Sequence, residues 1–132
     1  MIMKVDRILE TCLYVDDLNA AEKFYRRILG VESFSRVNNR HVFFRCGESM
    51  LLLFNPLETA KSSGDVPTHG AHGPGHVAFA IAPNQIDLCR RQLQENGIAI
   101  ETEITWPSGG RSIYFRDPAG NSVELATAQV WG

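Results

Sequence analysis

An internal repeat constrains the fold of this chain more than any other feature. Residues 40–53 (RHVFFRCGESMLLL) match residues 111–126 (RSIYFRDPAGNSVELA) as a strand, a turn at Gly and a second strand. Residues 9–30 match residues 75–97, and each segment is an extended run, a helix and a Gly that ends the helix. The sequence therefore predicts an α+β fold of two βαβββ modules.

The repeat also aligns side chains of the kinds that bind metals. It makes Glu10 equivalent to His76 and Leu51 equivalent to Glu124. Because side chains alternate along a strand, we expect these four residues to face away from the helices, on one shared inner surface. A buried set of Glu, His and Glu is costly without a cation or a reaction to use it.

Hydrophobic periodicity and turn residues place the elements. Asp16 or Asp17 is expected to cap the first helix, and Asn38-Asn39 suits a tight hairpin turn. We predict one domain over residues 1–132, in which module 1 spans about 6–54, a linker spans 55–74 and module 2 spans about 75–127. The predicted strands are 7–15, 31–37, 41–45, 49–54, 76–81, 98–105, 111–115 and 122–127, and the second helix is 83–96.

Composition excludes several classes of function. The chain has 132 residues, is 44% hydrophobic and 21% charged, and carries a net charge of −2. It has no basic run for nucleic acid and no apolar stretch for a membrane. Its cysteines (Cys12, Cys46 and Cys89) are odd in number and lack a CxxC pair, which predicts reduced thiols in a cytoplasmic protein.

Three motifs carry a resemblance to a known family: LYVDDLNAAEKFYRRILG, GHVAFAI and FRDPAGNSVEL. With them the chain, from about residue 8 to 126, resembles the vicinal oxygen chelate superfamily of glyoxalases, bleomycin-resistance proteins, fosfomycin-resistance enzymes and extradiol dioxygenases. The resemblance implies that the two modules form an open eight-stranded cup around a divalent metal, with one helix on the outer face of each module.

The resemblance also implies where the metal would bind. The family's four ligand positions correspond to Glu10, Leu51, His76 and Glu124. In another register Leu52 takes the position of Leu51, and neither leucine has a ligand atom. Glu10, His76 and Glu124 would therefore hold the metal, which we expect to be Mn, Zn, Fe, Ni or Mg. Three protein ligands leave positions for water and a bidentate substrate.

Other residues are candidates for catalysis and substrate binding. Glu10 and Glu124 are the candidate catalytic residues, and Glu10 is either a ligand or a general base. Tyr14 offers a hydroxyl to a substrate oxygen, Trp106 an aromatic wall and Arg111 a contact for an anion. Each also has a structural alternative, such as filling the cup or covering the edge of the core.

The expected function is that of a metal-dependent enzyme of the glyoxalase or dioxygenase type that acts on a small oxygenated substrate. Its reaction is that of a lyase, an isomerase, a transferase or a ring-cleaving dioxygenase. One alternative is a non-catalytic protein that sequesters a small molecule, as bleomycin-resistance proteins do. A third is a redox or metal-sensing protein built on the His-rich loop that contains His69 and His72. We expect a small-molecule ligand, no nucleic acid or membrane partner, and a homodimer.

Overall fold

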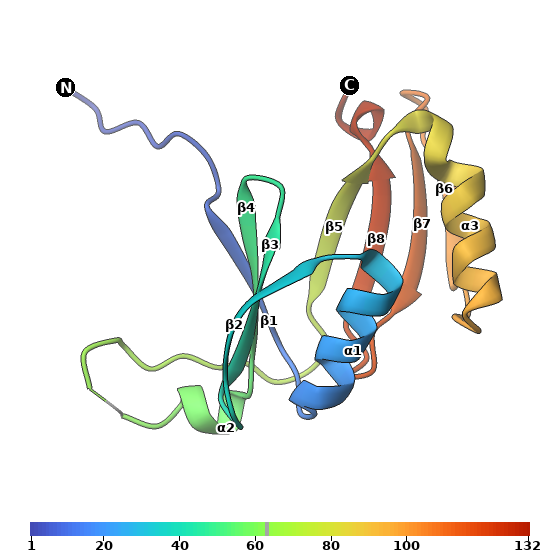
Figure 1. The fold of residues 1–132 in the computed structure, drawn as a ribbon. Helices are drawn as coiled ribbons and strands as arrows, with labels where there is room; N and C mark the ends of the chain where they lie inside the picture. Colours follow the sequence, from blue (N-terminus) through green and yellow to red (C-terminus); the bar gives the residue numbers. More distant parts are fainter. Residues whose placement is uncertain (63) are drawn as a thin grey trace.

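The structure is a computed structural model that describes residues 1–62 and 64–132. Ser63, in the predicted linker, lies outside the described residues. The chain forms two βαβββ modules joined by a crossover segment, which runs from the end of β4 to the start of β5, residues 55–75 (Figure 1). The first contains β1 (Glu10–Tyr14), α1 (Leu18–Leu29), β2 (Glu32–Val37), β3 (His41–Cys46) and β4 (Ser49–Phe54). The second contains β5 (His76–Ile81), α3 (Ile86–Glu95), β6 (Thr102–Thr105), β7 (Arg111–Arg116) and β8 (Ser122–Thr127).

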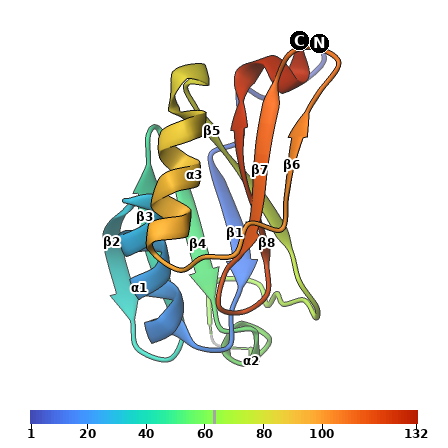
Figure 2. The same cartoon turned by 90° about the vertical axis from the view of Figure 1, so that its right-hand side faces the viewer.

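The strands form two four-stranded sheets with the same topology. Their orders are β1-β4-β3-β2 and β5-β8-β7-β6, and in each the first and last strands of the module pair in parallel. The predicted α+β class and the two βαβββ modules are confirmed. Both sheets are open, and within one chain they remain separate rather than forming one eight-stranded sheet (Figures 1 and 2).

The first helix forms where capping and turn residues predict it. The Asp17 carboxylate accepts a hydrogen bond from the Ala20 N–H at 3.0 Å, and Gly30 ends the helix with a φ of +67°. The buried stripe of α1 packs on its own sheet and also reaches the second module, where the Phe24 ring lies 6.2 Å from that of Phe115. One hydrophobic core is therefore shared by both modules.

A buried polar network fixes the junction between the modules. The Tyr25 hydroxyl on α1 donates to Asp117 Oδ2, in the turn between β7 and β8, at 2.8 Å. Asn121 donates from its side-chain amide to that carboxylate oxygen and to the backbone carbonyl of Tyr14, and it accepts from the Gly75 N–H. These bonds connect α1, β1, the end of the crossover and the β7–β8 turn.

The structure corrects the predicted position of Leu51. Leu51 and Leu53 lie in the shared core, and both are almost fully buried. Leu52 instead points to the opposite side of the sheet, where it shares a cavity with Glu10. The prediction that Leu51 shares the inner surface with Glu10 is therefore wrong, because the assignment on β4 was shifted by one residue.

Several segments differ from the predicted elements, and the first strand, predicted over 7–15, spans only Glu10–Tyr14. The predicted linker contains a short helix, α2 (Pro56–Thr59), capped by Asn55. The strand expected from residue 98 begins only at Thr102. Two short 3-10 helices, η1 (Pro83–Gln85) and η2 (Ala128–Trp131), were not predicted as separate elements. A Cβ on Gly110 would lie 2.2 Å from the backbone nitrogen of Val130, so glycine allows η2 to pack closely against this turn.

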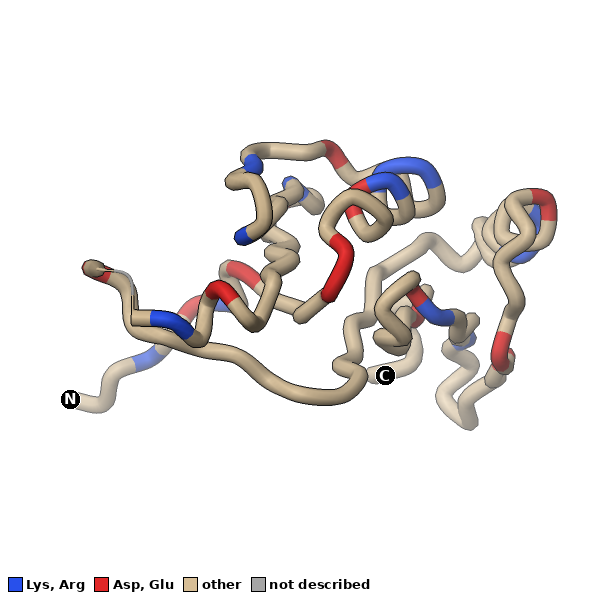
Figure 3. Tube along the Cα trace, turned by 90° about the horizontal axis from the view of Figure 1, so that it is seen from below, with Lys and Arg blue, Asp and Glu red and all other residues tan. Residues whose placement is uncertain are grey.

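Charged positions are spread over both modules (Figure 3). Within the described part of the chain, no helix is long and apolar enough to cross a membrane. All three cysteines are free thiols.

Candidate functional site

His76 and Glu124 meet on the inner face of the second sheet. His76 begins β5, and Glu124 lies in the middle of the neighbouring strand β8. The distance from His76 Nε2 to Glu124 Oε1 is 3.2 Å. Glu124 is buried, with 8% of its surface exposed, whereas the His76 side chain is half exposed. The pair thus combines a fixed carboxylate with an accessible imidazole.

The contact of the other His76 nitrogen fixes which ring nitrogen carries a hydrogen. His76 Nδ1 is 3.1 Å from the backbone carbonyl oxygen of Ser122. A carbonyl oxygen only accepts, so Nδ1 carries a hydrogen and donates it. The Nε2 lone pair of a neutral imidazole then points at a carboxylate oxygen, and two acceptors at 3.2 Å repel unless a cation lies between them. Either a proton or a metal ion satisfies this arrangement.

The carboxylate of Glu124 is held from its other side. Ser112 Oγ donates to Glu124 Oε2 at 2.6 Å, and the indole Nε1–H of Trp106 donates to Ser112 Oγ at 2.9 Å. Tyr114 lies on the same face, with its ring centroid 6.3 Å from that of His76. Burial, and then its hydrogen bond to Glu124, raise the pKa of Tyr114, so its hydroxyl stays a donor at neutral pH.

These residues surround a cavity of about 510 Å³. This volume suits a small ligand, and small side chains leave the space open beside the polar pair. The floor carries Ala78 and Ala126, and the C-terminal turn η2 forms one edge. The complete lining is Thr11, His76, Val77, Ala78, Trp106, Tyr114, Glu124, Ala126, Val130 and Trp131.

Glu10 does not join His76 and Glu124 within one chain. Its neighbour Thr11 lines their cavity, but alternation directs Glu10 to the opposite side of β1. There it lines a separate cavity of about 760 Å³ on the first sheet. Among the residues that the structure describes, no three His, Cys, Asp or Glu side chains form a cluster able to hold a metal.

The predicted substrate-binding residues have different positions. Trp106 lies in the wall of the cavity beside Glu124, as described above. Tyr14 is on the first sheet, where its hydroxyl is 2.6 Å from His69 Nδ1. Arg111 shares its side of β7 with the core residues Ile113 and Phe115, so it lies on the helix-covered face and not in this cavity.

His69 and the exposed Cys12 both lie next to Tyr14 on the first sheet. His69 packs edge-on against the Phe54 ring at 4.7 Å, besides its bond to Tyr14, and it thereby fastens the crossover to the first sheet. His72 lies further along the crossover and forms no three-residue cluster with His69 in the described chain. Burial, and then the charge and hydrogen bond of the neighbouring Cys12, raise the pKa of the Tyr14 hydroxyl.

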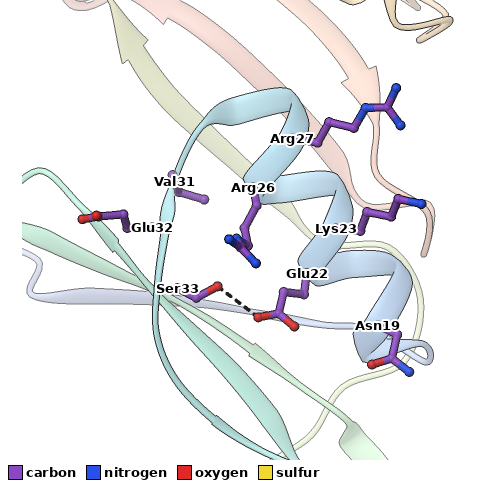
Figure 4. Close-up of a pocket in the computed structure, with 8 residues that line it drawn as sticks. All are labelled: Asn19, Glu22, Lys23, Arg26, Arg27, Val31, Glu32 and Ser33. Atoms are coloured by element: carbon purple, nitrogen blue, oxygen red, sulfur yellow. Dashed lines mark hydrogen bonds between the residues drawn. The ribbon is translucent and has the colours of Figure 1, made fainter.

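A further hollow of about 760 Å³ lies between α1 and the beginning of β2 (Figure 4). It is lined mainly by charged side chains, and Ser33 donates to Glu22 across it. It lacks the apolar walls typical of a small-molecule site.

Sequence reasoning missed Ser112, Tyr114 and Trp131. Ser112 and Tyr114 alternate with the core residues of β7, so the same period of two that placed Glu124 would have placed them on the inner face. The position of Trp131 depends on η2 folding back over the sheet, which no local pattern indicates.

Known proteins of similar sequence and structure have this fold. The chain is 41% identical to lactoylglutathione lyase from Agrobacterium tumefaciens, whose crystal structure matches with a TM-score of 0.95 over 98% of this chain and 99% of that one. It is 28% identical to glutathione transferase FosA of Serratia marcescens, over 86% of this chain and 74% of FosA. It is 26% identical to metallothiol transferase FosB of Staphylococcus epidermidis, over 97% of this chain and 86% of FosB.

A family model covers nearly the whole chain. The match extends over residues 5–125 and therefore includes both modules and the His76–Glu124 pair. This agrees with the resemblance noted from the sequence motifs. The chain belongs to the glyoxalase/bleomycin resistance protein/dioxygenase superfamily.

Proposed function

We propose that this protein is a divalent-metal-dependent enzyme that binds a small oxygenated substrate next to His76 and Glu124. The observation that carries the proposal is the His76 imidazole facing the buried Glu124 carboxylate, with Nε2 and Oε1 3.2 Å apart. The similarity to a lactoylglutathione lyase and to metallothiol transferases supports it. A substrate screen with the bound metal would distinguish lyase, isomerase, transferase and ring-cleaving activities.

The residues present fit a metal ion. An imidazole nitrogen and a carboxylate oxygen are good ligands for Zn, Mn, Fe or Ni, and Ser122 and Ser112 orient them from behind. A bound metal would act as a Lewis acid that stabilises negative charge on a substrate oxygen. The hydroxyl of Tyr114 would donate to the same substrate, and Trp106 would flank it.

We propose that Glu10 completes this site across a homodimer. Its cavity on the first sheet and the His76–Glu124 cavity on the second are both open surfaces in the single chain. In a two-fold dimer, the first sheet of one chain can face the second sheet of the other. Glu10 of a second copy would then serve as the third ligand, or as a general base near the metal.

Metal content tests the first part of this proposal. We expect about one divalent metal per chain in protein purified without chelator, and loss of that metal in Glu124→Ala. Glu95→Ala, an exposed change at the end of α3, is the matched control and should keep the metal. If wild type stays metal-free after incubation with Mn²⁺, Zn²⁺, Fe²⁺ or Ni²⁺, the enzyme proposal fails and sequestration of a ligand becomes the better explanation. Screening 2-oxoaldehyde, epoxide and catechol substrates with the bound metal would then define the reaction.

Subunit mixing tests the shared site. Glu10→Ala and Glu124→Ala should each be inactive alone. After unfolding and refolding together, mixed dimers would carry one intact site of two, so activity should return to about a quarter of wild type. Equal inactivity before and after mixing would show that Glu10 and Glu124 do not act across an interface.

A further inference from the structure

We infer that the segment before β1, residues 1–9, is an arm that packs on η2 of a second copy of this chain and forms a wall of that copy's His76–Glu124 cavity. This contact rests on the proposed function, because it occurs in the dimer in which Glu10 reaches the second copy's site. It uses no metal ligand, and no residue of the arm lines the cavity on the first sheet.

The arm is apolar, and its own chain leaves it uncovered. All nine of its residues are exposed, and Figure 1 shows the segment running away from both sheets. Half of the large hydrophobic side chains that are exposed in the described chain belong to this short segment: Met1, Ile2, Met3, Val5, Ile8 and Leu9. Apolar surface gathered in this way is typical of a contact with another protein.

The base of the arm is fixed in an extended direction. The backbone carbonyl of Leu9 accepts from the Met50 N–H at 3.1 Å, so the pairing of the first strand with β4 continues one residue before β1. Arg7 Nη1 donates to the backbone carbonyl of Glu48 at 2.9 Å. These two bonds keep residues 7–9 beside β4, and the arm therefore leaves the sheet in the direction that β1 sets.

Alternation along this extended stretch places Ile8 on the same side as Glu10. Residues two apart in a strand share a face and lie about 7 Å from each other. Ile8 is 77% exposed in the single chain. In the proposed dimer Glu10 approaches His76 and Glu124 of the second copy, so Ile8 comes to the edge of the same cavity.

The turn η2 presents an apolar surface at that edge. Val130 and Trp131 line the cavity together with His76 and Glu124. Trp131 is 94% exposed, although η2 itself is held by its close packing on Gly110. An indole on a fixed turn that is open to water offers a large contact area to a partner.

The arm is long enough for this contact. An extended chain covers about 3.5 Å per residue, so the eight steps from Ile2 to Glu10 reach about 28 Å. Because Trp131 and Glu124 line one cavity of about 510 Å³, an arm that starts beside Glu124 can cross the cavity edge and η2.

A second copy is the partner that these positions favour. Each copy carries one arm and one η2, so a two-fold dimer covers both pairs of apolar surfaces at once. The contact is also continuous with the proposed interface, because the arm leads directly into Glu10.

Disulfide trapping between two differently tagged copies tests the contact. One copy carries Ile8→Cys and the other carries Trp131→Cys, and both carry Cys12→Ser because Cys12 is an exposed native thiol. A chelator is present throughout, since an apolar contact needs no metal. Oxidation should give a covalent pair of the two tagged copies as the main product on a non-reducing gel. In the matched control, Leu57→Cys on α2, which is 74% exposed, replaces Ile8→Cys and should give little of this product.

Sedimentation measures how much the arm contributes to the dimer. Ile8→Ser should raise the dissociation constant of the dimer about tenfold or more, because an apolar side chain is lost from the interface. Leu57→Ser should leave the constant unchanged, and circular dichroism would verify that both variants are folded.

The outcomes separate this contact from the proposed function. A wild-type dimer without the trapped pair, or an equal effect of Ile8→Ser and Leu57→Ser, would overturn the contact and leave the metal proposal standing. A disulfide formed within one chain that carries both Ile8→Cys and Trp131→Cys would overturn it as well, since the arm would then cover its own chain. A trapped pair from protein that binds no metal would support the contact, although the enzyme proposal would fail.

Discussion

The hydroxyl of Tyr25 donates a hydrogen bond to Asp117 Oδ2 across 92 residues of sequence and joins the first helix to the second module. Both residues are buried, Tyr25 completely and Asp117 to 4% exposure. The carboxylate also accepts from the backbone N–H groups of Ala119 and Asn121, so its oxygens are satisfied within the turn. This contact sets how the two modules are placed.

Removing this hydroxyl should destabilise the whole domain. Tyr25→Phe takes one donor from a buried carboxylate, and we expect the free energy of unfolding to fall by about 1–3 kcal/mol. Urea unfolding followed by circular dichroism would measure the change. Tyr114→Phe, where the hydroxyl borders an open cavity, should lower the free energy of unfolding clearly less. Equal losses in the two variants would mean that the Tyr25–Asp117 bond does not contribute more to stability than an ordinary hydrogen bond at the surface.

Ser112 should tune the metal site without being a ligand. Its hydroxyl donates to Glu124 and accepts from Trp106, so Ser112→Ala frees both groups. Provided that the proposed metal binds, its affinity should fall about 10–100-fold, as is usual when a residue behind a ligand is lost. Competition with a coloured chelator would measure this, and Ser108→Ala, an exposed turn position, should match wild type. An unchanged affinity would place Glu124 outside the metal site.

The contact between Gly110 and η2 predicts sensitivity to a single methyl group. In Gly110→Ala the new Cβ would lie 2.2 Å from the backbone nitrogen of Val130, so η2 must move. We expect a loss of about 1–3 kcal/mol in unfolding free energy. We also expect a shift in Trp fluorescence, because the partly buried Trp106 bonds to the Gly110 carbonyl through its backbone N–H. Gly70→Ala, whose Cβ would have ordinary contacts of 3.6 Å or more, is the control. No difference between the two variants would show that η2 is not packed as described.

Stability should depend on pH through His41. Its pKa is lowered in the folded protein by burial and then by Arg40. The unfolded chain therefore binds a proton more readily, and stability present above the unfolded pKa of about 6.5 is lost as pH falls through the lower folded value. Urea unfolding between pH 7.5 and 5 would follow this. His41→Gln should flatten the curve in that window, and an identical slope in variant and wild type would exclude His41 as the cause.

The repeat predicted the modules because each copy carries complete local signals. Asn39 does adopt a positive φ of 67°, and Asp17 caps its helix as expected. Local patterns of this kind act within a few residues, so the sequence is sufficient to place them.

The error at Leu51 came from aligning two turns of different length. The register pairs Ala78 with Glu124 in one sheet and Cys12 with Leu52 in the other, so Leu52 is the structural equivalent of Glu124. The turn at Gly120 is longer than the turn at Gly47, and an alignment through it shifts β4 by one residue. A shift of one residue exchanges the two faces of a strand.

The position of Glu10 was unpredictable for a different reason. Alternation assigns each side chain to a face of its own sheet, and it did so correctly for Glu10, His76 and Glu124. It carries no information on how one sheet is turned relative to the other. That orientation depends on contacts such as Phe24 with Phe115, which form between modules far apart in sequence.

The single core that the modules share makes them interdependent in folding. Leu13 and Phe24 come from the first half, Ile113 and Phe115 from the second, and all are buried in one cluster. A chain cut in the crossover between α2 and β5 would thus give two fragments that each expose half of a core. Such fragments would be unfolded alone and would fold on mixing, so the protein could serve as a split reporter whose signal depends on bringing its halves together.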